Sequence, residues 1–170
     1  MFSTLFRDQA DSLILAWTDA VYADRRTDLP VILSYRELVE HVPELLEELA
    51  AVLDGASDYE EIVEATRRLR FHAQARFQQG CLIDEVAREL FLLRDALNDF
   101  LWREVSGAAG GEAGALREAL RRTDVFMDEL VSQAILVYAA SLRPNVPTRT
   151  STWPPPRRRK SDFRGHDERK

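Results

Sequence analysis

Charged side chains interrupt an apolar helical stretch at residues 71–95, FHAQARFQQGCLIDEVARELFLLRD. On a helical wheel, Arg76 falls on the apolar face of one predicted helix and Arg94 on the apolar face of the next. A guanidinium cannot lose its proton, so its burial without a partner costs several kcal/mol. We therefore predict that both arginines are paired, most simply by forked contacts with carboxylates. Glu89 and Glu104 are the local candidates.

The candidate site consists of His72, Arg76, Glu89 and Arg94, and two interpretations of it stay open. The first is a structural network in which the arginine stems lie along the core and their heads reach water. The second is a polar pocket between helices that binds an anion or switches with a signal. Catalysis is disfavoured, because a lone histidine and ion pairs do not supply a nucleophile, a base and an orienting group together.

No metal or cofactor is expected. His41, His72 and His166 lack the spacing of metal ligands, and the single Cys81 excludes an internal disulfide and a cysteine zinc cluster. His72 is the one candidate for a proximal haem ligand, and Arg76 flanks it. We interpret His41 as a surface or capping residue and Cys81 as a half-buried small residue.

The composition is ordinary for a soluble globular domain: of 170 residues, 45% are hydrophobic and 31% are charged. The opening MFSTLFRDQ reaches Arg7 and Asp8 before an apolar region can form, so no signal peptide is expected. The sequence has no uncharged apolar run of about 18 residues, the length that a membrane span requires. We expect a cytoplasmic location and no membrane contact.

Helical periodicity along the chain predicts an all-α bundle of about five helices, for which a globin-like arrangement is one option. The expected elements are a first helix with Ser3 as its N-cap, a helix from Ser34 that Pro43 kinks or divides near His41, and helices over about 58–79, 83–105 and 112–142. Capping boxes are predicted at Ser34–Glu37 and Ser57–Glu60, and Gly80 ends the third helix.

The last predicted helix carries apolar residues at alternating spacings of four and three, a coiled-coil-like seam. Towards its end a second apolar stripe, which includes Val131, Ile135 and Leu142, widens the seam. Residues 127–142 thus present a wider apolar face than four short helices can cover. We therefore predict a homodimer through the last helix.

The charge divides the chain into two expected parts, a helical sensory or regulatory domain (1–142) and a disordered, Pro/Arg-rich tail (143–170). The first part has 14 basic and 26 acidic residues, whereas the tail has nine basic and three acidic ones. The tail residues Arg157, Arg158, Arg159 and Lys160 are candidates for binding a partner, either nucleic acid or an acidic protein. A solubilising tail, or one folded back on the acidic domain, is the alternative.

The order of these motifs resembles the N-terminal domain of RsbRD-type regulators, the RsbT co-antagonist family. The similar residues are His72, Arg76, Gly80, Glu89 and the LLR that ends at Arg94. Upstream, LSYRELVEHVPELLEELAAVL at residues 33–53 is similar to the family's helix with a central proline. The resemblance extends over roughly residues 10–140.

The resemblance implies an all-helical sensory domain that precedes an output module in stress-signalling regulators or histidine kinases. This sequence contains neither a phosphorylatable output domain nor a kinase ATP-binding region, so the domain either stands alone or is a fragment, and it must act by binding. Ala73 follows His72 where a phosphoacceptor histidine commonly has an acidic neighbour, so phosphorylation of His72 is not expected.

The sequence therefore favours a non-enzymatic sensory or regulatory domain of a signal-transduction or stress-response pathway. Its expected partners are a signalling protein, either a kinase or an anti-sigma-type regulator, and a second copy of the chain. The alternative functions are a nucleic-acid-binding accessory protein that acts through the tail, and a small enzyme.

Overall fold

The computed structural model describes residues 1–55, 57–107 and 113–142, and over these residues every regular element is an α-helix. The helices are α1 (Phe2–Ala23), α2 (Leu29–Ile32), α3 (Tyr35–Val39), α4 (Val42–Asp54), α5 (Tyr59–Arg68), α6 (Arg70–Gln78), α7 (Ile83–Gly107) and α8 (Ala113–Ser141). The predicted all-α bundle is confirmed. The tail predicted to be disordered, residues 143–170, lies outside the described residues.

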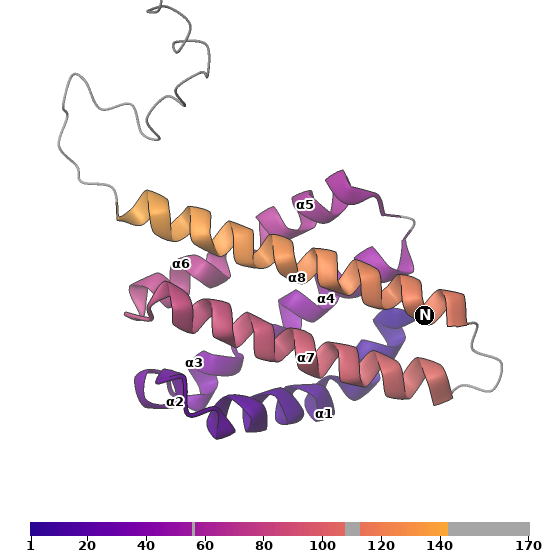
Figure 1. The fold of residues 1–170 in the computed structure, drawn as a ribbon, viewed down its shortest axis with the longest axis horizontal. Coiled ribbons are helices and arrows are strands. Elements are labelled where there is room, and N and C mark those ends of the chain that lie inside the picture. Colours follow the sequence, from indigo (N-terminus) through magenta and orange to yellow (C-terminus); the bar gives the residue numbers. More distant parts are fainter. Residues whose placement is uncertain (56, 108–112, 143–170) are drawn as a thin grey trace, which may run out of the picture.

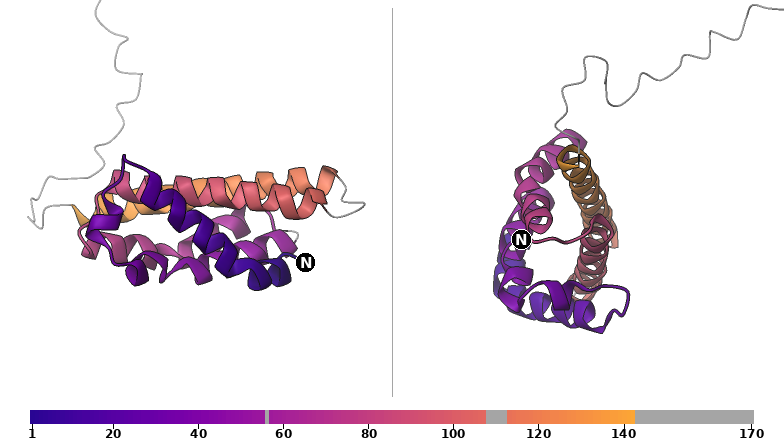
Figure 2. Two further views of the ribbon diagram at one scale, coloured as in Figure 1. Left: turned by 90° about the horizontal axis from the view of Figure 1, so that it is seen from below. Right: turned by 90° about the vertical axis from the view of Figure 1, so that its left-hand side faces the viewer.

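The two long helices α7 and α8 lie side by side and antiparallel (Figure 1). A second layer, which contains α1, α4, α5 and α6, covers one face of this pair (Figure 2). The core lies between the layers, and Trp17 of α1 is fully buried there. No described helix is long and apolar enough to cross a membrane.

The predicted division near His41 is confirmed, since α3 ends at Val39 and α4 begins at Val42. Pro43 occupies the first turn of α4, where its missing N–H removes no helical hydrogen bond. The capping box of α3 is also confirmed, because the backbone N–H of Glu37 donates to Ser34 Oγ at 3.3 Å and the Glu37 carboxylate accepts from the Ser34 N–H at 2.8 Å.

The third predicted helix is wrong in two respects. It is divided into α5 and α6 at Leu69, whose backbone (φ −92°, ψ 9°) is not helical. No glycine or proline marks this break. The capping box of α5 is Asp58–Glu61, one residue later than predicted, because Asp58 has the extended backbone of a cap and accepts from the Glu61 N–H at 3.0 Å. Gly80 follows α6 with a positive φ of 83°, as a helix-ending glycine should.

The start of α1 is capped by Asp54, which lies at the far end of α4. The prediction that Ser3 caps this helix is therefore wrong. The Asp54 carboxylate accepts from the backbone N–H groups of Phe2 at 2.6 Å and Ser3 at 2.8 Å. Burial raises the pKa of Asp54, but hydrogen bonds from the N-terminal ammonium group, the Ser3 hydroxyl and these N–H groups outweigh it and hold the pKa well below its usual range. Asp54 therefore joins the beginning of α1 to the end of α4.

Replacing Asp54 with alanine should lower the free energy of unfolding by about 0.5–2 kcal/mol, the usual cost of losing an N-cap acceptor. Asp11→Ala is the matched control, because this substitution also removes one carboxylate, from an exposed position on α1. It should change stability by no more than about 0.5 kcal/mol. Urea melts of both variants measure the difference, and equal losses would contradict the capping role.

Candidate functional site

The centre of the candidate site is an ion pair between Arg76 of α6 and Glu89 of α7, with side chains 0% and 1% exposed. Arg76 Nη2 donates to Glu89 Oε1 at 2.7 Å, and Arg76 Nε donates to Oε2 at 3.0 Å. This is the forked geometry in which a guanidinium and a carboxylate bind most strongly. The pairing predicted for Arg76 is present, and its partner is Glu89, one of the two candidates.

The remaining donors of Arg76 bind the short helix α3. Nη1 donates to the backbone carbonyl oxygen of Glu37 and Nη2 to that of Leu38, both at 2.9 Å. Nη1 also donates to Gln79 Oε1 at 2.9 Å. The last carbonyl groups of a helix have no partner within the helix, so a buried end needs donors from elsewhere. Arg76 supplies them and thereby connects α3, α6 and α7.

The pair is charged in the folded protein. Burial raises the pKa of Glu89, but His72 and Arg76 beside it favour the carboxylate more strongly, and the net effect is a pKa well below the usual range. Burial lowers the pKa of Arg76, yet its hydrogen bonds to Glu89 leave it above its ordinary value. At neutral pH, protonation of Glu89 and deprotonation of Arg76 are both unfavourable while the other partner is present.

Two further helices reach this pair through the backbone. The Trp17 indole N–H of α1 donates to the Glu89 carbonyl at 3.3 Å. The Cys81 N–H donates to the Arg76 carbonyl at 3.0 Å, and the Tyr138 hydroxyl of α8 donates to the Cys81 carbonyl at 2.7 Å. Burial raises the pKa of the Cys81 thiol to about 11, so it remains a protonated, unreactive group.

His72 lies next to the pair without joining it by a hydrogen bond. It is 3% exposed, and its Nε2 is 3.6 Å from Glu89 Oε2. Neither ring nitrogen has a hydrogen-bond partner among the described residues. The ring of His41, at the start of α4, stands edge-on to the His72 ring with 5.6 Å between centroids. His41 precedes α4 as predicted, but its side chain makes no capping hydrogen bond and is half-buried.

Arg94 is not part of this network. It is paired with a carboxylate, as predicted, but that carboxylate is neither Glu89 nor Glu104, and the Arg94 side chain is only partly buried. Its side chain is 27% exposed and pairs with Asp128 of α8 at 2.9 Å. The guanidinium carbon also lies 5.1 Å from the centroid of the Phe91 ring. The proposed alternative partner, Glu104, is exposed. Arg94 sits at the outer edge between α7 and α8, where its long stem allows the head to reach water.

The model of the family described as the RsbT co-antagonist protein rsbRD N-terminal domain matches residues 11–143. The chain belongs to this family. No curated protein and no solved structure matches it. The resemblance noted from the sequence is confirmed, and the family is one of stress-response regulators.

Some contacts of this RsbRD N-terminal domain were not foreseen. Gln79 follows Arg76 by three residues, and that spacing is a signal that sequence reasoning could have used. The carbonyl groups that Arg76 reaches carry no sequence signal at all. A second buried carboxylate, Glu85 of α7, accepts hydrogen bonds from the Thr27 hydroxyl and, at 3.1 Å, from the Asp28 N–H. It holds the start of α2 against α7.

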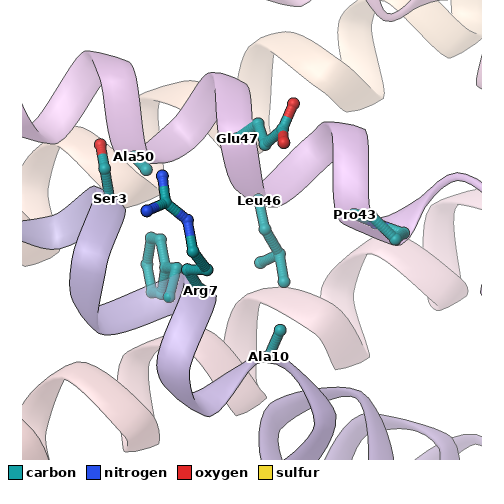
Figure 3. Close-up of a pocket in the computed structure, with 8 residues that line it drawn as sticks. Ser3, Arg7, Ala10, Pro43, Leu46, Glu47 and Ala50 are labelled. Atoms are coloured by element: carbon teal, nitrogen blue, oxygen red, sulfur yellow. The ribbon is translucent and has the colours of Figure 1, made fainter.

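A groove of about 350 Å³ in this RsbRD N-terminal domain lies apart from the network, between α1 and α4 (Figure 3). Its floor is apolar and includes Phe6 and Leu46. Arg7 from α1 and Glu47 from α4 line its two sides, and both side chains are exposed. None of the candidate site residues lines this groove, so it is a feature of the surface separate from the buried network.

The two arginines should respond very differently to substitution. Arg76→Ala leaves Glu89 buried without its partner and should lower the free energy of unfolding by about 3–5 kcal/mol. Arg94→Ala removes a largely solvated pair and should cost less than about 1 kcal/mol. Chemical denaturation of the two variants measures both values. Similar losses of unfolding free energy for the two variants would contradict the expectation that the buried pair contributes more to stability than the solvated one.

Proposed function

We propose that this domain is a non-enzymatic, cytoplasmic regulatory module that acts by binding other proteins in a stress-response pathway. The family supports the regulatory role. The buried network supports the absence of catalysis, because Arg76 and Glu89 are occupied by each other and by α3, and Cys81 is a protonated thiol. The network instead joins α1, α3, α6, α7 and α8, so a shift of one helix must affect the others.

The observation that carries the proposal is the row of exposed apolar side chains at the end of α8. Ile135, Leu136 and Leu142 are 51%, 56% and 70% exposed. Leu82, in the turn before α7, and Phe91 of α7 are also exposed, at 64% and 40%. Exposed apolar groups that cluster on adjoining elements mark a surface for protein contacts. We assign this surface to a homodimer through α8.

A signalling protein, either a kinase or an anti-sigma-type regulator, is the second partner that we propose, and membership of a co-antagonist family supports a signalling partner. The proposed network His72, Arg76 and Glu89 would relay changes between the helices that carry the contact surface. Nucleic-acid binding through Arg157, Arg158, Arg159 and Lys160 is the alternative, which the basic tail favours. The acidic charge of residues 1–142 opposes it, because that part of the chain repels a polyanion.

The dimer is tested by charging its proposed surface. Sedimentation of the 19.5 kDa chain at micromolar concentration should give twice this mass. Ile135→Asp should give the monomer mass, because a carboxylate cannot be buried unpaired in an apolar interface. Leu15→Asp, at a 58% exposed position on α1, is the matched control and should remain dimeric. A monomeric wild-type chain would refute the assigned interface.

The class of partner is tested by affinity capture from the protein's own cell extract, with nuclease added and mass spectrometry as the readout. The full chain should retain a kinase or an anti-sigma-type regulator. A variant with alanine at Arg157, Arg158, Arg159 and Lys160 should retain it equally well. If nuclease or the tail variant removes everything that is captured, the nucleic-acid alternative is correct and the proposed function is not.

A further inference from the structure

The buried histidine beside the Arg76–Glu89 pair has a property that the regulatory role does not explain. His72 is 3% exposed, and both of its ring nitrogens lack a hydrogen-bond partner among the described residues. His41, on the α3–α4 turn, also leaves Nδ1 without one. A buried polar group without a partner costs free energy, which a purely structural role gives no reason to accept. A group whose role is to accept a proton must instead keep a nitrogen free.

We propose that His41 and His72 form a proton-binding pair that releases α3 and the start of α4 from α6 at mildly acidic pH. Histidine is the side chain that ordinarily changes charge in this range. The two rings are 5.6 Å apart, and His41 also lies edge-on to Phe71 at 5.1 Å. The inference rests on the proposed regulatory function, for which it supplies an input.

The charges around the pair explain why a second proton is not tolerated in the closed state. The two histidines face the Arg76 cation of α6 and the Glu89 carboxylate of α7. Around the start of α4, Glu40 and Glu44 lie near His41 and favour its protonation, although they outweigh neither burial nor the cations. Arg76 already neutralises Glu89, so protons on both histidines leave the site with an uncompensated positive charge.

The direction of the effect follows from linkage. Burial, followed by His72 and Arg76, lowers the pKa of His41 below its ordinary 6.5. His41 therefore binds a proton more weakly in the closed site than in the open one. The stability that the neutral His41 contributes is complete above about pH 6.5 and falls as the pH drops below that value. Acidification thus favours the open state.

The geometry indicates which part of the fold opens. A proton on His41 adds positive charge on the side of the site that Arg76 occupies, and this guanidinium is one of the groups that oppose it. The same guanidinium holds the Glu37 and Leu38 carbonyl groups at the end of α3. Repulsion between the two rings acts on the next residues along the chain, at the start of α4. The α3–α4 segment is therefore the part of the fold that should detach.

Hydrogen exchange of the isolated full chain tests this at about pH 7.5 and about pH 5.5. After correction for the intrinsic exchange rate, the protection of the Leu38 and Leu45 amides should fall about tenfold at the lower pH. The amide of Leu130, within α8, should keep its protection. His41→Gln should abolish the difference between the two pH values, since glutamine cannot take up a proton. His72→Gln should do the same.

His166→Gln is the matched control, because it removes the one remaining histidine and should leave the pH effect intact. Equal protection of Leu38 at both pH values in the wild-type chain would overturn the proposal, as would a fall that persists in His41→Gln. If His72→Gln does not fold, the half-buried His41 decides the question alone. These measurements need no partner, so their failure would leave the capture and sedimentation experiments, and hence the proposed function, unaffected.

Discussion

A guanidinium with no access to water has to find acceptors inside the protein, and the fold is organised around those of Arg76. Glu89 provides the opposite charge, while the end of α3 and Gln79 take the remaining donors. The requirement explains why a helix as short as α3 survives. Its final carbonyl groups would be unsatisfied without Arg76, and a helix of five residues has little stability of its own.

Contacts between helices could be predicted from the sequence where they depend on helical periodicity. They could not be predicted where they depend on partners far away in the sequence. The apolar stripes predicted the helices, and the cost of burying a charge predicted that Arg76 pairs with a carboxylate, for which Glu89 was one of two candidates. The same wheel placed Arg94 in the core, although it lies at the edge of the α7–α8 seam. A wheel gives the direction of a side chain from its own helix and says nothing of where the neighbouring helix ends.

Local boundaries show a similar division. The Ser34 capping box and the proline-divided turn near His41 follow from chemistry within a few residues, and they are present. The break at Leu69 has no glycine or proline, so only packing against other helices can produce it. The cap of α1 comes from Asp54, and no local pattern could have indicated it. The family resemblance rested on the order of His72, Arg76, Gly80 and Glu89. His72, Arg76 and Glu89 meet around one ion pair, and Gly80 follows the end of the helix that carries Arg76.

The link between Asp54 and the start of α1 has a consequence for how the molecule folds. The joined residues are 51 positions apart, so the cap forms only after α1 and α4 have come together. The antiparallel α7–α8 pair is adjacent in the chain and closes a much shorter loop, which costs less conformational entropy. Native contacts with short loops generally form early. The first turn of α1 should thus be among the last parts to become ordered.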